Sequence, residues 1–130
     1  MKEHTPQICM IAVKQNGRAL RFINAKNQTL NICLEAVKQT GLALQFVANK
    51  YPEICLGAVQ NCGYSLRWVE EQTPDICLAA VQNDGNALEY VIEQTPEICL
   101  AAVKQNSKSL THIKSLKNLQ AILDMLEKEK

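Results

Sequence analysis

The stretch that decides the fold is TPDICLAAVQNDGNALEYVIEQ, residues 73–94. Its first half recurs four more times along the chain, in the phrases PQICMIAV (6–13), LNICLEAV (30–37), PEICLGAV (52–59) and PEICLAAV (96–103). The cysteine of the phrase recurs after 24, 22, 22 and 22 residues, counted from Cys9 to Cys99. A nearly fixed period of this length predicts a stack of similar structural units.

The first half of each unit is predicted to be an α-helix. In residues 73–94, Thr73 can cap the helix, Pro74 suits its first position, and Asp75 meets the positive end of the helix dipole. The apolar residues of the phrase cover an arc of about 200° when they are projected at 100° per residue. An arc this wide suits a helix that packs both on its own unit and on the neighbouring one.

The second half of each unit begins after a turn. Gly85 is predicted to end the first helix by taking the left-handed conformation. NALEYV (86–91) then predicts a short helix of about two turns, with Ala87, Leu88 and Val91 on one face. Helices this short are marginal alone, so the units must be stabilised by stacking.

We therefore predict an all-α fold, a short alpha solenoid of five helix-turn-helix repeats of 22–24 residues plus a C-terminal capping helix. Residues 1–130 are expected to form a single domain. The repeats are placed at about 5–28, 29–50, 51–72, 73–94 and 95–115, and the capping helix at about 116–128.

The repeated phrases also carry a family resemblance. With TPEICLAAVKQN (95–106) and ALEYV (87–91) as examples, about residues 5–115 resemble tandem repeats of bacteria and some protists that are catalogued as a domain of unknown function. The resemblance implies the repeat fold, and it brings no activity or catalytic residues with it. Because such repeats also occur in candidate host-directed effectors of intracellular bacteria, it further implies a role in a host cell. Thr29-Leu30, Tyr51-Pro52 and Ser107 depart from the pattern.

Composition narrows the classes of partner. The net charge is only +1, so no overall field draws in nucleic acid or an anionic membrane, and neither is an expected partner. No apolar run approaches the roughly 18 residues that span a bilayer, and no secretion signal opens the chain. Six cysteines without such a signal favour a reducing cytoplasm, either the bacterial cytosol or the host cytosol.

Neither a metal nor a catalytic site is expected. Equivalent cysteines of stacked helices lie about 8–10 Å apart, whereas zinc requires four ligands at about 2.3 Å. Cys62 lies outside the periodic column, and a thiol redox or metal protein using Cys62 is one alternative function. His4 and His112 fall in the first and last units, so no base is expected beside it. No catalytic motif is present, and we expect no enzyme activity and no cofactor.

The aromatic column is the strongest candidate site, because it occupies one position of every unit: Phe22, Phe46, Trp68, Tyr90 and His112. These rings either cover the groove between neighbouring helices or anchor a partner. A neighbouring column varies in charge, as Arg21, Gln45, Arg67, Glu89 and Thr111. The predicted partner-binding residues are Tyr64, Arg67, Trp68, Tyr90, Phe46 and Arg21.

The leading functional prediction is therefore a protein–protein interaction module, which includes a regulator or a bacterial effector module. The main alternative is a structural unit that associates with itself weakly through its N-terminal edge. That edge carries Met10-Ile11, which is more apolar than Leu78-Ala79 at the same place in the fourth unit.

Overall fold

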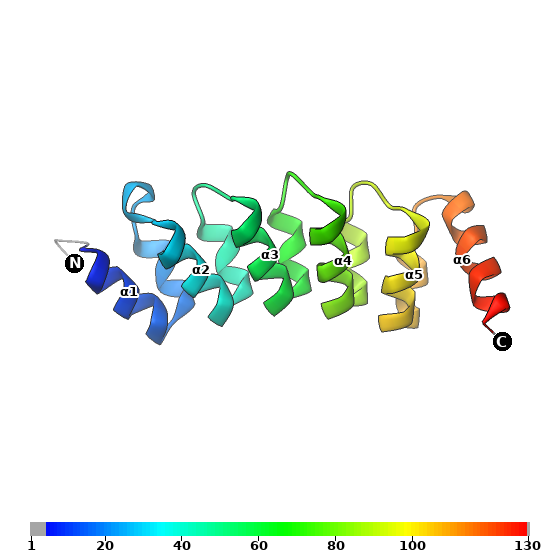
Figure 1. Cartoon of the computed structure of the whole chain (residues 1–130), viewed down its shortest axis with the longest axis horizontal. Helices are drawn as coiled ribbons and strands as arrows, with labels where there is room; N and C mark the ends of the chain where they lie inside the picture. Colours follow the sequence, from blue (N-terminus) through cyan, green and yellow to red (C-terminus); the bar gives the residue numbers. More distant parts are fainter. Residues whose placement is uncertain (1–4, 130) are drawn as a thin grey trace.

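The computed structural model describes residues 5–129, which form a row of stacked helical units (Figure 1). The helices α1 to α5 lie side by side, and each is followed by a 3₁₀-helix that runs behind it. The two chain ends lie at opposite ends of the row, and loops connect the units along its upper edge. The all-α solenoid predicted from the repeat is therefore confirmed.

The α-helices are α1 (Pro6–Gln15), α2 (Leu30–Gln39), α3 (Pro52–Asn61), α4 (Pro74–Asn83), α5 (Pro96–Gln105) and α6 (Leu116–Lys128). The 3₁₀-helices are η1 (Gly17–Phe22), η2 (Ala25–Asn27), η3 (Gly41–Phe46), η4 (Gly63–Trp68), η5 (Gly85–Tyr90) and η6 (Ser107–His112). The short helix η2 lies between the first and second units, so it takes up the longer spacing of 24 residues between their cysteines.

Threonine caps begin four of the five repeat helices, and three of these caps follow the predicted Thr-Pro pattern. The hydroxyl of Thr73 accepts a hydrogen bond from the Ile76 amide at 3.3 Å, and Thr5 and Thr95 make the same bond in their units. Thr29 also caps its helix, although no proline follows it. Tyr51 begins α3 without a side-chain cap. Each such bond satisfies a free amide at a helix start. The Thr-Pro pattern therefore predicts the starts of α1, α4 and α5 correctly.

The second helix of each unit has the predicted length of about two turns. It is a 3₁₀-helix, however, and not an α-helix. Its bonds join residues three apart, as in the 2.9 Å bond from the Ala87 amide to Asp84 O. Six residues of 3₁₀-helix make two turns, and residues i and i+3 are eclipsed along its axis. The side chains therefore align differently from the α-helical projection that the sequence suggests. Leu88 and Val91, three residues apart, are both buried.

The prediction of a left-handed glycine after each α-helix is wrong. Among residues 5–129 no residue has a positive φ, and Asp84, which ends α4, is extended with φ −148°. Gly63 serves another purpose, because a Cβ added to it would lie less than 3.0 Å from Ala80 O of the next helix. Gly17, Gly41 and Gly85 are equally close to the next unit. The glycines thus allow close approach between repeats.

The core is one continuous layer between the α-helices and the 3₁₀-helices. Each middle unit buries the same positions, which in the fourth unit are Ile76, Cys77, Ala80, Val81, Ala87, Leu88 and Val91; in the third unit Ser65 takes the place of the alanine in the second helix. Full burial of each large aliphatic side chain contributes about 1.5–3 kcal/mol. Since each set lies against the sets before and after it, no unit has a core of its own.

The helix α6 covers the last unit, as predicted. Ile122 is fully buried against the core, and Asn118 Nδ2 donates to Gln94 O at 2.8 Å. Lys104 Nζ and Glu129 Oε1 form an ion pair at 2.8 Å. No further repeat helix packs against the start of η6. The first position of η6 can therefore be Ser107, where the other units need a glycine. Within residues 5–129, none of the helices is both long and apolar enough to cross a membrane.

Candidate functional site

The aromatic column forms one surface of the solenoid. Its members are the last residues of η1, η3, η4, η5 and η6. Phe22 is 70% exposed, and the other four, Phe46, Trp68, Tyr90 and His112, are half-buried. Each ring therefore packs partly into the groove between units and keeps part of its surface open. The two interpretations of the column, groove cover and contact surface, are compatible with the same geometry.

Four of the six predicted site residues form one cluster, which we call the Arg67 cluster: Tyr64, Arg67, Trp68 and Tyr90. The Tyr64 ring meets the Trp68 ring edge to face with centroids 5.9 Å apart, and it meets the Tyr90 ring at 5.4 Å. The Arg67 guanidinium carbon lies 5.3 Å from the centroids of Tyr64 and Trp68 and 5.9 Å from that of Tyr90. Arg67 Nη1 also donates to the Tyr64 hydroxyl. One cation thus lies among three rings.

The 3₁₀ geometry explains how the Arg67 cluster forms. Tyr64 and Arg67 are three residues apart on η4, so their side chains are eclipsed and stack on one another. Tyr90 comes from η5, the equivalent helix of the next unit, and reaches Tyr64 across the repeat interface. The sequence predicts the proximity of Arg67 and Trp68, whereas the contact with Tyr90 depends on how the units stack.

The remaining two predicted residues form a smaller cluster in the first two units. The Arg21 guanidinium lies 5.1 Å from the Phe22 ring centroid and 5.8 Å from that of Phe46. Gln45, which lies between the two clusters in the varying column, donates from its side chain to Leu42 O at 3.1 Å. The same pairing of an arginine with rings from two successive units therefore occurs twice on this surface.

Charges near the Arg67 cluster are unevenly placed. Loss of hydration raises the pKa of the Tyr90 hydroxyl to about 12, and the neighbouring Tyr64 and Glu89 side chains add to the shift. Glu89 Oε2 lies 3.8 Å from His112 Nε2. The cluster thus contains the cation of Arg67, and the carboxylate of Glu89 lies beside its Tyr90, one unit further along.

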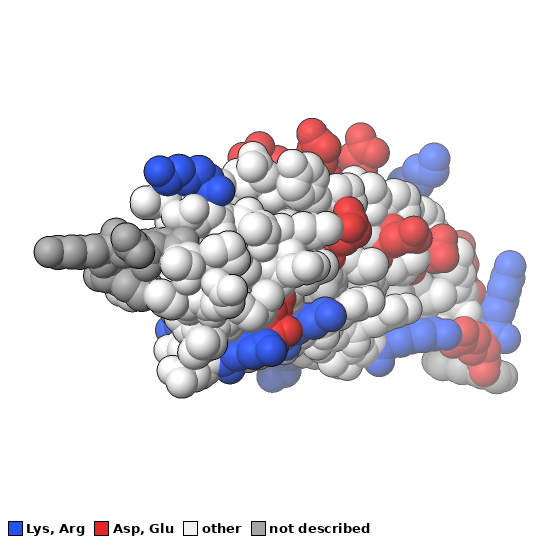
Figure 2. All heavy atoms as spheres, turned by 60° about the vertical axis from the view of Figure 1, so that its left-hand side comes forward, with Lys and Arg blue, Asp and Glu red and all other residues white. Residues whose placement is uncertain are grey.

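Charged side chains are unevenly distributed on the face that Figure 2 shows. Asp and Glu side chains gather along the middle of the upper edge and below it, and Lys and Arg side chains lie mostly along the lower edge, with others at both ends of the upper edge. The first helical turns hold Glu53, Asp75 and Glu97, and the last turns hold Lys14, Lys38 and Lys104. Each sign faces the helix end that it stabilises. The helix dipole therefore accounts for these carboxylates.

The periodic cysteines are buried, as predicted. Cys9, Cys33, Cys55, Cys77 and Cys99 are at most 3% exposed, and all are free thiols. Burial raises the pKa of the Cys33, Cys55, Cys77 and Cys99 thiols, which makes them less reactive at neutral pH. No group of three or more metal-ligating side chains is close enough for an ion in the part of the chain that the structure describes.

The thiol outside the column is more accessible. Cys62 ends α3 and is half-buried, between the last turn of that helix and Gly63. His112 lies two units further along, in η6, and His4 lies outside the described residues. A reactive role for Cys62 stays a prediction.

Two sets of amide side chains that join the units are missing from the sequence predictions. Near the lower ends of the helices, the Gly63 amide donates to Asn83 Oδ1 at 2.7 Å, and Asn83 Nδ2 donates to Gln60 O at 3.1 Å. Asn61 and Gln105 act in the same way in their units. In the upper loops, Gln28, Gln72 and Gln94 bridge successive units. The available signal was an Asn or Gln six residues after each periodic cysteine, and a Gln five residues before three of the five.

Comparison with known protein families identifies the repeat. The family model for a domain of unknown function (DUF4116) matches residues 29–73, 51–95 and 73–119, in three overlapping windows. Separate searches of curated proteins and of solved structures found no match. The windows together extend from residue 29 to residue 119, well over half of the chain, and their offsets follow the 22-residue period. The chain therefore belongs to the DUF4116 family, whose repeats here form a solenoid of α-helices and 3₁₀-helices.

Proposed function

We propose that this chain is a protein-binding module and that its partner docks on the surface formed by the 3₁₀-helices, centred on the Arg67 cluster. The observation that carries the proposal is the exposed guanidinium of Arg67 held among three aromatic rings from two units. Arginine, tryptophan and tyrosine are the residue types that contribute most to binding at protein interfaces. Side chains already held by one another lose little freedom when a partner binds.

The chemistry of the cluster indicates what the partner presents. A guanidinium has five N–H donors, and Arg67 uses one of them on the Tyr64 hydroxyl. A carboxylate of the partner would bind the remaining donors, and an apolar side chain beside it would cover the open part of the Trp68 ring. The proposed partner thus carries an acidic residue next to an apolar one.

The smaller cluster extends the proposed surface. Arg21 lies in η1 and Arg67 in η4, two repeat steps apart. At about 8–10 Å for each step, the two guanidinium groups are roughly 20 Å apart along the solenoid. A partner that spans both clusters would bury an area typical of a stable interface, about 800 Å² on each side.

A pull-down with matched variants tests the proposal. Extract proteins captured by the wild type are quantified against those captured by a variant with Arg67→Glu and Trp68→Ala, after circular dichroism has shown that both are helical. A control variant with Lys38→Glu and Gln60→Ala changes two exposed residues of the α-helical surface. We expect a partner retained by the control and lost from the first variant. Equal recovery by both variants would remove the Arg67 cluster as the binding site.

Self-association is a second candidate, and exposed apolar side chains on α1 favour it. Ile8 is 39% exposed and Ile11 is 58% exposed. Stacking of a second copy on this edge would bury both. Light scattering across a hundredfold range of concentration tests the idea: the mass should rise with concentration for the wild type and stay monomeric for Ile11→Glu. A monomer at every concentration would refute this candidate.

We further propose that the protein works in a reducing cytoplasm. Six free cysteines, with no disulfide in the described part of the chain, support this location. The choice between a bacterial cytosol and a host cytosol, with its implied effector role, stays a prediction from family resemblance.

A further inference from the structure

The glutamine bridges of the upper loops follow one pattern at three of the four interfaces between repeats. Between the third and fourth units, Gln72 Nε2 donates to Val69 O of its own loop at 3.3 Å and to Tyr90 O of the next unit at 2.8 Å. Gln72 Oε1 accepts the Ile92 amide at 2.9 Å and the Cys77 thiol at 3.5 Å. The carboxamide thus pairs with a carbonyl and an amide two residues apart.

The same geometry recurs at two other interfaces. Gln28 Nε2 donates to Phe46 O at 2.9 Å while its Oε1 accepts the Ala48 amide at 2.9 Å. Gln94 Nε2 donates to His112 O at 2.9 Å, and its Oε1 accepts the Lys114 amide at 2.9 Å. A primary carboxamide is therefore the group that this kind of interface binds.

The interface between the second and third units lacks this group. Lys50 stands where the others have glutamine, five residues before Cys55. Lys50 Nζ donates to Val47 O of its own loop at 3.0 Å, and the Cys55 thiol donates to Lys50 O. Trp68 O and the Glu70 amide, the equivalents of Tyr90 O and the Ile92 amide, have no hydrogen-bond partner among the residues that the structure describes.

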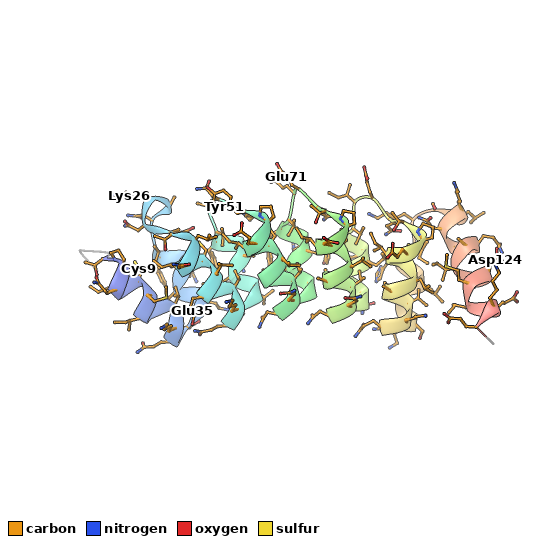
Figure 3. All side chains as sticks on the ribbon, viewed as in Figure 1. Cys9, Lys26, Glu35, Tyr51, Glu71 and Asp124 are labelled. Atoms are coloured by element: carbon orange, nitrogen blue, oxygen red, sulfur yellow. The ribbon has the colours of Figure 1, made fainter. Side chains whose placement is uncertain are left out.

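A cleft is present at this interface. It has a volume of about 290 Å³ and is lined by Ala48, Lys50, Pro52, Cys55, Val69, Glu70 and Glu71. Figure 3 labels Tyr51 and Glu71 on the two upper loops beside it. Its lining residues belong to the two upper loops and to the first turn of α3, whereas the side chains of the Arg67 cluster lie on the surface of the 3₁₀-helices. The cleft is large enough to admit a side-chain amide together with part of what carries it.

We propose that this cleft binds a primary carboxamide, which replaces the missing glutamine between Lys50 and Glu70. The guest NH₂ group donates to Trp68 O, and the guest carbonyl accepts the Glu70 amide. The ammonium of Lys50 stays on Val47 O. The site binds its guest without any chemical step, and of the Arg67 cluster it uses only the backbone carbonyl of Trp68, not the side chains.

Other polar groups fit the two unpaired atoms less well. A carboxylate can accept from the Glu70 amide but has no hydrogen to donate to Trp68 O, and it would meet the charges of Glu70 and Glu71. An ammonium can donate to Trp68 O but cannot accept from the Glu70 amide. A primary carboxamide has a donor and an acceptor on two atoms bonded to the same carbon, as the three glutamines show.

Nuclear magnetic resonance on the ¹⁵N-labelled protein tests the proposal, with propionamide as the probe. We expect a saturable shift of the Glu70 amide resonance and little change at Ile92 and Lys114, whose amides are already paired at the other interfaces. N,N-dimethylpropionamide and propionate, which lack the donor, should bind about tenfold or more weakly. No saturable response of Glu70 to propionamide, or an equal response to all three compounds, would overturn the proposal.

Two variants provide the matched control. Lys50→Gln inserts the internal carboxamide, so it should abolish the propionamide response, whereas Lys50→Met removes the charge without filling the site and should keep it. An undiminished response in Lys50→Gln would overturn the proposal. Acetyl-glutamine-N-methylamide separates two sources of the guest: tighter binding than propionamide assigns the site to a glutamine side chain of a protein, and equal binding assigns it to a free small carboxamide.

Discussion

Replacing Gly63 by alanine tests the reason for the glycine in each repeat. The new Cβ would lie less than 3.0 Å from Ala80 O and 3.1 Å from the Cβ of Asp84, so η4 and α4 must separate. The separation strains the 2.7 Å bond from the Gly63 amide to Asn83 Oδ1 and the 3.1 Å bond from Asn83 to Gln60 O. Both effects destabilise the interface between the third and fourth units.

The magnitude follows from the two effects. Overpacking costs about 1–3 kcal/mol, and two weakened hydrogen bonds cost about 0.5–1.5 kcal/mol each. Gly63→Ala should therefore lower the free energy of unfolding by about 2–6 kcal/mol. For a chain of this size, we expect a midpoint of thermal unfolding lower by roughly 6–24 °C. Urea unfolding followed by circular dichroism and by Trp68 fluorescence measures the change.

Two further variants separate close approach from backbone conformation. Ser107→Gly, at the equivalent position of the last unit, should change stability by no more than about 1 kcal/mol, because no repeat helix lies against it. Gly63→Asn should cost at least as much as Gly63→Ala, since its side chain is larger. If Gly63→Asn is clearly more stable than Gly63→Ala, a left-handed conformation and not close approach is the reason for the glycine. Gly63→Ala within about 0.5 kcal/mol of wild type would also refute the reasoning.

Three other predictions concern caps, thiols and pH. Thr73→Ala should lower the free energy of unfolding by about 1 kcal/mol, and Tyr51→Thr should raise it by a similar amount if its ring is dispensable, both measured in urea. Cys62 should react with a thiol reagent in the folded protein well before the five buried cysteines, and fast reaction of several thiols would contradict the burial pattern. Because the pKa of Tyr90 is raised from 10.0 to about 12, the folded state keeps its proton longer than the unfolded state. Stability from this group should be present below pH 10 and decline as the pH rises toward 12, and Tyr90→Phe should show a flatter decline in this range.

The sequence predicts the architecture well because its signals are local. The cysteine phrase, the threonine before four of the five repeat helices and the apolar arc are properties of short segments, and helix geometry is enough to interpret each of them. The helix α6 was predictable for the same reason, since its apolar residues, such as Leu119 and Ile122, recur at helical spacing.

The candidate site was only partly predictable. Arg67 and Trp68 are neighbours in the chain, and the aromatic column follows from the period. The ring contact between Tyr64 and Tyr90 joins two units, however, and it depends on the 3₁₀ type of the second helix. The Gln72 bridge was missed because a polar residue in a loop gives no sign that its amide pairs with the backbone of the next unit.

By itself the sequence determined the number of units, the all-helical class of the fold and the residues that each unit buries. These features follow from a repeated pattern of helix starts and apolar positions. Only the tertiary structure decided how closely the units approach and which polar groups meet between them. The spacing between repeats depends on the fit of side chains and backbone from two units at once. The role of Gly63 and the missing bridge at Lys50 are consequences of that spacing, so neither could be derived from one unit alone.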